Sequence, residues 1–220
     1  MLSVYQRYYF YLITSALLIS FYIVAKKKSS TNNYLLIVIA AVSLVVELYA
    51  NKMARAGQPN FFLYNLYTIV EISIYLFVIR NLLFGNTFRK IVLYFLVLFN
   101  PLAIVRLIYF GGFEAFDTLT YAIGCFVLCC GCIFYFYELF EYKYAIFILQ
   151  EPSFWLVTAL MFYYTLGIPI YGVWSQFVDP PRFIIENYIL IIDSLNFVVY
   201  LLINLALLCQ IRYNKPITLR

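Results

Sequence analysis

Four ionisable side chains lie within stretches of sequence that are otherwise almost wholly apolar. They are Glu47, Glu71, Arg106 and Asp193. A charged group in the hydrocarbon of a bilayer costs on the order of 3 kcal/mol or more, so it normally faces a protein interior or a water-filled cavity. The three acids outnumber the one base, and either a proton or a bound cation must balance the difference. We therefore expect these four residues to belong to a polar, ligand-binding cavity.

The residues around Asp193 form a polar stripe. Asn196 and Tyr200 follow Asp193 by three and seven residues, which places all three on one face of a helix. A second stripe includes Tyr67 and Glu71, which are four residues apart. Because neither stripe can face lipid, we expect the two to face each other across a cavity that opens to the outside. The alternative is that these groups only join neighbouring helices through hydrogen bonds.

Arg106 requires a partner of opposite charge. An unpaired guanidinium that far into a helix would be costly, so we expect a carboxylate within salt-bridge distance of it. The expected partners, in order, are Glu71, Asp193 and Glu47.

A helix-bending motif lies beside the expected cavity. Pro169 removes one backbone hydrogen bond and bends its helix, and the nearby Gly167 lets the helix flex. We interpret Gly167 and Pro169 as a gate, with Trp174 capping the cavity. The alternative is a static kink.

Catalytic and metal sites find little support in the sequence. The chain has no histidine, which excludes Ser-His-Asp and Cys-His triads, HExxH zinc sites and histidine-bound haem. Four of the five cysteines lie between Cys125 and Cys132, in an apolar stretch where free cysteine usually packs as a small apolar side chain. We therefore predict neither an enzyme nor a metal or cofactor, although an acid-only lipid chemistry on Glu71 and Asp193 stays open.

The elements that carry these residues are expected to be transmembrane helices. Hydrophobic residues make up 65% of the 220-residue chain and charged residues 11%, against about 45–50% and about 25% in soluble domains. Crossing the hydrocarbon core takes about 20 mostly apolar residues. Seven stretches meet this length: Tyr8–Ala25, Tyr34–Ala50, Phe61–Phe84, Ile91–Phe110, Leu119–Phe140, Ser153–Phe177 and Tyr188–Ile211. The sequence predicts an all-α integral membrane protein with a single seven-helix domain over residues 1–220.

The basic residues indicate how these helices are oriented. The run Lys26–Lys28 directly follows the first span, and cytoplasmic loops carry an excess of Lys and Arg. With the N-terminus outside, ten basic residues lie on the inner face and four on the outer face. We predict an N-out, C-in protein of the inner (cytoplasmic) membrane.

Glu138, near the inner end of its span, is expected to be a solvated surface group.

Two segments that are 122 residues apart share a sequence pattern. The pattern Pro-x-Phe-x3-Asn-x5-acid fits both Pro59–Glu71 and Pro181–Asp193. This offset matches residues 1–84 with residues 119–211 and leaves the helix at 91–110 as a linker, which is the layout of a parallel 3+1+3 repeat. The alternative is chance similarity in apolar sequence.

Short motifs suggest relatives without giving an activity. The layout and size resemble sugar-transporter and PQ-loop heptahelical proteins, although the chain has no Pro-Gln dipeptide. Asn65-Leu66-Tyr67, Phe154-Trp155 and Leu195-Asn196 resemble motifs of small, uncharacterised seven-helix membrane proteins of Bacteroidetes-type bacteria. The first resemblance implies transport, and the second implies no established activity.

Three functions remain open at this point. The first is a sensor that binds a small ligand in the outer-half cavity and signals to a membrane protein partner or within a homo-oligomer. The second is a small solute or proton-coupled transporter, favoured by the repeat and the intramembrane acids. The third is an accessory or effector membrane protein of a bacterial defence system. In each case the lipid bilayer is a partner, and the net charge of +5 requires no nucleic acid.

Overall fold

The computed structural model describes residues 4–26, 30–109, 113–141, 148–174, 182–213 and 217, without the side chains of residues 4–7, 172–174, 182–186 and 189. Its helices are α1 (Val4–Ala25), α2 (Thr31–Arg55), α3 (Phe61–Leu82), α4 (Asn86–Tyr109), α5 (Thr118–Glu141), α6 (Pro152–Trp174) and α7 (Arg182–Tyr213). All seven are long and apolar enough to cross a membrane, and no strand occurs in the described residues. The predicted all-α fold with seven potential spans is confirmed. The N-out orientation and the 3+1+3 repeat stay predictions.

Several helices extend past the spans expected from hydropathy. α2 begins at Thr31 rather than Tyr34 and ends at Arg55 rather than Ala50. α7 has 32 residues and is the longest helix. The backbone hydrogen bonds continue through polar residues after the apolar run has ended, so hydropathy marks the membrane-crossing part of a helix rather than all of it.

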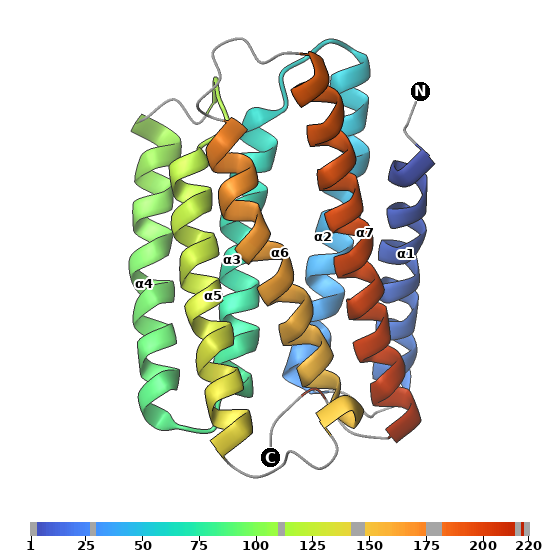
Figure 1. Ribbon diagram of the computed structural model, residues 1–220, viewed down its shortest axis with the longest axis vertical. Coiled ribbons are helices and arrows are strands. Elements are labelled where there is room, and N and C mark those ends of the chain that lie inside the picture. The colour runs from blue at the N-terminus through green and yellow to red at the C-terminus, as the bar shows by residue number, and fades with distance from the viewer. Residues whose placement is uncertain are drawn as a thin grey trace.

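Six helices form a closed ring, and the seventh lies outside it. Each of the pairs α1–α2, α2–α3, α3–α5, α5–α6, α6–α7 and α7–α1 is in contact. α4 packs against α3 and α5 only from the outer side, at one edge of the bundle (Figure 1). We call the end where α1, α3, α5 and α7 begin the upper end, as drawn in Figure 1, and the opposite end the lower end. The ring arrangement leaves α3 facing α6 and α7 across the bundle centre.

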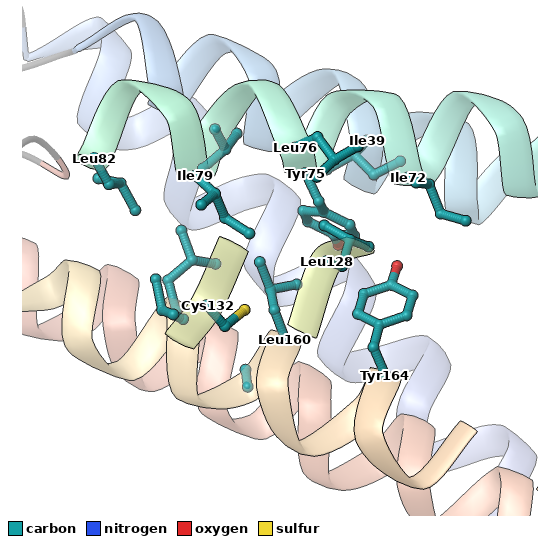
Figure 2. Packing of buried hydrophobic residues seen from close by; sticks show 14 of the residues in the cluster. Ile39, Ile72, Tyr75, Leu76, Ile79, Leu82, Leu128, Cys132, Leu160 and Tyr164 are labelled. Carbon is teal, nitrogen blue, oxygen red and sulfur yellow. The ribbon is translucent and has the colours of Figure 1, made fainter. Parts of the chain in front are cut away.

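The lower half of the ring is a solid apolar core. Its members include Leu76, Ile79 and Leu82 from α3, which are completely buried. They meet Leu128 of α5 and Leu160 of α6, and Figure 2 shows these side chains filling the space between the helices. Apolar burial is worth little against lipid, so such a core is held by close packing.

Two glycines let α5 approach α3 closely. A Cβ added at Gly124 would overlap the Ile72 side chain, and one added at Gly131 would lie 3.2 Å from Ile79. The two glycines are seven residues apart, as are the two isoleucines, so both pairs repeat along one helical face. Small residues at such contacts are typical of helix packing in membranes.

Glu138 is buried at the lower end, which corrects the prediction of a solvated group. Its side chain is only 2% exposed. One carboxylate oxygen accepts the Phe84 backbone N–H at 2.6 Å and the other accepts the Gly85 N–H at 2.8 Å. These donors lie in the turn between α3 and α4, where the helix pattern leaves backbone groups without partners. Glu138 therefore fastens this turn to α5.

A residue far along the chain also closes the lower end. The Ile217 carbonyl oxygen accepts a hydrogen bond from the Asn32 side chain at 2.8 Å, and Asn81 donates to Asn32 at 3.0 Å. Asn32 and Ile217 are both completely buried. This chain of hydrogen bonds ties α2 and α3 to residue 217.

Candidate ligand-binding cavity

A cavity of about 370 Å³ lies in the upper half of the bundle, within the usual volume range of small-molecule sites. It extends from Asn60 and Phe61 at the upper end down to Tyr75 and Tyr200. Its walls come mainly from α3, α6 and α7, with single residues from α1, α2 and α5. Ten tyrosines line it: Tyr9, Tyr64, Tyr67, Tyr75, Tyr121, Tyr163, Tyr164, Tyr171, Tyr188 and Tyr200.

Both predicted polar stripes reach this cavity. Tyr67 and Glu71 line it from α3, and Asp193, Asn196 and Tyr200 line it from α7. Glu47 of α2 also lines it. The structure therefore brings six of the seven predicted cavity residues together around one space. Whether they bind a ligand there stays a prediction.

Glu71 is the deepest acid of the cavity. Its carboxylate accepts a hydrogen bond from the Tyr67 hydroxyl at 2.9 Å, and that hydroxyl lies 2.7 Å from the Ser43 hydroxyl of α2. The Ser43 hydroxyl also lies 2.7 Å from the Ile39 carbonyl oxygen, so when Tyr67 donates its proton to Glu71, the single Ser43 proton is directed to Tyr67 or to Ile39. Glu71 lies deep in the bundle yet is only partly buried, because its side chain faces the cavity.

Glu47 is the acid nearer the upper end. The Tyr9 hydroxyl of α1 donates to it at 3.0 Å, and the Tyr64 hydroxyl of α3 lies near its carboxylate. The Asp193 carboxylate is close enough to act on Glu47 electrostatically, and it is 5% exposed. The Tyr9 hydrogen bond joins α1 to α2 beside the cavity, and Asp193 of α7 adds a second acid close to Glu47.

Two tyrosine hydroxyls at the cavity wall make no hydrogen bond with the described residues. They belong to Tyr121, which is 4% exposed, and Tyr164, which is 1% exposed. The Tyr164 hydroxyl is a neighbour of Glu71 but does not meet hydrogen-bond geometry with it. Buried polar groups of folded proteins are nearly always hydrogen-bonded, so two unpaired hydroxyls at one wall indicate a site for a ligand or water.

The predicted gate residues have different positions relative to this wall. A Cβ at Gly167 would lie 2.7 Å from the Tyr121 hydroxyl, so the absence of a side chain there lets Tyr121 sit against α6. Pro169 lies inside α6, which continues through it to Trp174. The Trp174 side chain lies outside the described residues, and gating stays a prediction.

Arg106 is paired, but the expected partners were wrong. Its guanidinium forms a salt bridge with Asp117, with Nη2 2.9 Å from Oδ1 and Nε 3.0 Å from Oδ2. Glu71, Asp193 and Glu47 line the cavity, whereas Arg106 does not. Asp117 lies in the turn directly before α5, just outside the predicted spans, and a search confined to acids within spans misses it.

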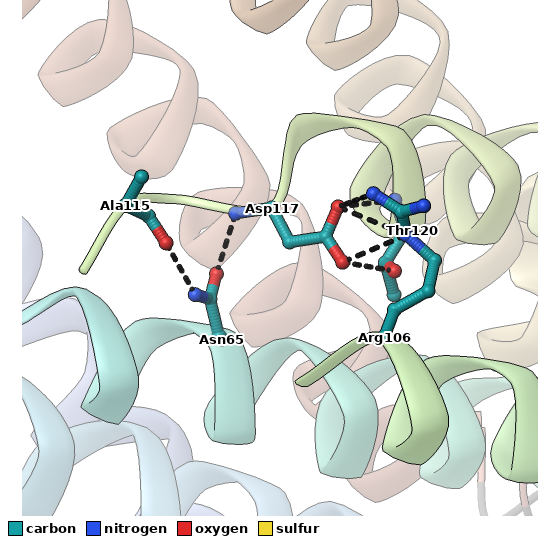
Figure 3. Close-up of polar contacts among 5 residues, drawn as sticks. All are labelled: Asn65, Arg106, Ala115, Asp117 and Thr120. Atoms are coloured by element: carbon teal, nitrogen blue, oxygen red, sulfur yellow. Dashed lines mark hydrogen bonds and ion pairs between the residues drawn. The ribbon is translucent and has the colours of Figure 1, made fainter. Parts of the chain in front are cut away.

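The Arg106 salt bridge is part of a cap at the upper end (Figure 3). Asp117 also accepts hydrogen bonds from the Thr120 backbone N–H and hydroxyl, as an N-cap residue does. Asn65 of α3 accepts the Asp117 N–H at 2.9 Å and donates to the Ala115 carbonyl at 2.8 Å. Burial alone would raise the pKa of Asp117, but the hydrogen bonds from Arg106 and Thr120 outweigh it and hold that pKa below its ordinary value.

Asn204, the next polar residue of the α7 stripe, serves packing. Its side chain accepts a hydrogen bond from Ser15 at 2.8 Å and donates to the Leu12 carbonyl at 2.9 Å. It therefore joins α7 to α1 below the cavity.

In the described part of the chain, no three Cys, Asp or Glu side chains cluster as a metal site requires.

The tyrosines of α1, α5 and α6 were missed by sequence reasoning. Only the tyrosines of α3 and α7 stood out, because an acid lay on the same helical face. The high count of 23 tyrosines was a signal, but tyrosine also anchors helices at the membrane surface.

Comparisons with known proteins add no relative. No protein-family model matches the chain, and searches of curated proteins and of solved structures found no match. Function must therefore be inferred from the chemistry and shape of the cavity.

Proposed function

We propose that this polytopic membrane protein is a sensor that binds a small ligand in the upper-half cavity. The observation that carries this proposal is the lower boundary of the cavity, which is closed by packed side chains. Polar and aromatic side chains line it down to Tyr75 and Tyr200, and directly below them lies the solid layer of Leu76, Ile79 and Leu128. A binding site that ends on a packed core suits ligand recognition, whereas a transporter must open to both faces.

Helix α6 is the element best placed to transmit the bound state. It contributes Tyr163, Tyr164 and Tyr171 to the cavity, and Pro169 interrupts its backbone hydrogen bonding between Tyr164 and Tyr171. Its lower half packs on α5 and α7, and Ser153 near its start accepts a hydrogen bond from Tyr135 of α5 at 3.0 Å. A ligand that moves the tyrosines of α6 would shift this lower end, where a partner membrane protein or a second copy would respond.

The first test asks whether the cavity holds a small molecule. The full chain is purified in lipid nanodiscs, and the small molecules that co-purify are identified by mass spectrometry. We expect Asn196→Trp, which fills the cavity, to lose compounds that the wild type retains. The matched control is Leu201→Trp on the same helix, since Leu201 is 48% exposed and lies outside the cavity. Identical profiles for the wild type and Asn196→Trp would contradict the proposal.

The second test separates sensing from transport. The enriched compound is offered to proteoliposomes that contain the protein. We expect binding without uptake, and a ligand-dependent change in the distance between spin labels at the lower ends of α3 and α6. Accumulation of the compound inside the vesicles would instead support the transporter alternative.

A further inference from the structure

We propose that the cavity takes a small organic cation that carries an alkylated ammonium group. This inference rests on the proposed function and names the chemical class of its ligand. It depends on three properties of the cavity: its aromatic lining, its charge and its unpaired hydroxyls.

The aromatic lining is dense and comes from several elements. Of the 21 residues that line the cavity, twelve are Tyr or Phe. Near the upper end, the rings of Tyr121 and Tyr171 lie 4.4 Å apart, and Phe116 lies 5.3 Å from Tyr171. Tyr188 of α7 adds a ring nearly perpendicular to Tyr171, at 6.1 Å. Rings from four segments at differing angles present both faces and edges to one space, and aromatic faces attract alkylated ammonium groups.

The charge of the lining favours a cation. Glu47, Glu71 and Asp193 contribute three carboxylates, and no Lys or Arg is among the described residues that line the cavity. The side-chain hydrogen bonds that Glu47 and Glu71 accept within the described structure come from the hydroxyls of Tyr9 and Tyr67, which are neutral donors. An anionic ligand would be repelled by these acids, whereas a cation is attracted to them.

The unpaired hydroxyls are an independent indication of a ligand. Those of Tyr121 and Tyr164 are buried at the wall, where each is able to donate one hydrogen bond and to accept others. A hydroxyl or carbonyl group on the ligand would satisfy them. The ligand that fits best has an alkylated ammonium end for the rings and acids, and a short polar end for the two hydroxyls.

A bare metal ion fits this cavity less well. Hard cations take six or more oxygen ligands at short distance, and the described acids do not converge in groups of three. The volume of about 370 Å³ also exceeds what one ion fills. An organic cation uses the rings as well as the acids.

The test compares two probes that differ in one atom. Choline carries a quaternary nitrogen, and 3,3-dimethylbutan-1-ol has the same shape with carbon in its place and no charge. Binding of each to the wild-type protein in nanodiscs is measured by saturation-transfer NMR and calorimetry. We expect choline to bind at least about tenfold more tightly than the alcohol, since ring and carboxylate attraction act only on the cation. This comparison depends on no variant.

Variants then assign the effect to residues. Glu71→Gln keeps the side-chain size and removes the charge, and Tyr171→Leu removes a ring, so each should weaken choline binding about tenfold without changing that of the alcohol. The matched controls are Glu141→Gln and Tyr94→Leu, which change exposed residues outside the cavity and should leave choline binding unchanged. Circular dichroism and gel filtration verify that each variant is folded.

The outcomes separate this inference from the proposed function. Equal or tighter binding of the alcohol, or co-purification of a neutral or anionic compound that Asn196→Trp loses, overturns the cation class and leaves the sensor standing. If neither probe binds and Asn196→Trp loses no compound, both proposals fail together. Choline binding that survives both Glu71→Gln and Tyr171→Leu would also overturn the assignment.

Discussion

The upper and lower halves of the bundle use the same helices in opposite ways. α3 presents Tyr67, Glu71 and Tyr75 to a cavity in its upper turns, and Leu76 and Ile79 to a solid core one turn below. In lipid, where burial of apolar surface contributes little, close packing and buried hydrogen bonds must hold the helices together. The lower half is thus closely packed, whereas the upper half encloses a cavity. Substitutions in the two halves should differ accordingly.

The largest effect is expected at Glu138 in the lower half. Glu138→Ala removes the carboxylate that accepts hydrogen bonds from the half-buried backbone N–H groups of Phe84 and Gly85, so the free energy of unfolding should fall by about 2–5 kcal/mol. Unfolding in mixed detergent micelles, followed by circular dichroism, measures the change. Glu141→Ala is the control, because Glu141 is exposed on the same helix and should change stability little. Equal effects at the two positions would show that Glu138 does not fasten the turn.

The close contact between α5 and α3 should give the next largest effect. Gly124→Val places new atoms where Ile72 packs, and we expect the free energy of unfolding to fall by about 1–3 kcal/mol. Gly131→Ala is a graded comparison, since its added Cβ would lie 3.2 Å from Ile79 and should cost less. If Gly124→Val is as stable as the wild type, the contact between α5 and α3 is less tight than described.

Acid should weaken the cap at the upper end, with a smaller effect. Because the pKa of Asp117 is lowered in the folded protein, its stabilisation is present above the ordinary value of about 3.9 and is lost as the pH falls through the folded pKa. The melting temperatures of the wild type and Asp117→Asn should differ at pH 7 and converge below about pH 4. A constant difference over this range would contradict a contribution from the charged Asp117.

The smallest change in stability is expected at the cavity wall. Tyr164→Phe removes a buried hydroxyl that has no partner among the described residues, so the free energy of unfolding should stay within about 0.5 kcal/mol or rise slightly. Choline binding should nevertheless weaken, because the ligand loses a hydrogen-bonding group. Tyr135→Phe is the control: its hydroxyl donates to Ser153, so its removal should lower stability and leave binding unchanged. A large loss of stability in Tyr164→Phe would mean that this hydroxyl has a structural partner.

The sequence predicts those features that follow from an ionisable residue within an apolar helix. Glu71 and Asp193 stand out because an acid in an apolar helix is costly, and their helical spacing with Tyr67 and Asn196 places them on definite faces. The seven spans are predictable for the same reason, since length and hydropathy suffice. These local patterns account for the fold class and for two walls of the cavity.

Other features depend on how segments meet and have no local pattern. In the sequence Asp117 is an ordinary loop acid, and only the structure shows that the turn before α5 lies beside Arg106. In the sequence Glu138 is expected to be solvated, and only the structure shows that the turn after α3 packs against it. Tyr121 and Tyr164 are equally suited to a membrane surface, a core or a cavity, so composition alone does not place them.

The link between Ile217 and Asn32 has a consequence for how the protein is made. The two residues are 185 positions apart, and at about 5–20 residues per second a ribosome needs roughly 10–40 s to cover that distance. During this interval the Asn32 amide, at the start of α2, lacks the acceptor that it has in the finished fold. The hydrogen bond between them therefore forms only after residue 217 has been synthesised, and until then water must take the place of the Ile217 carbonyl at the lower end of α2.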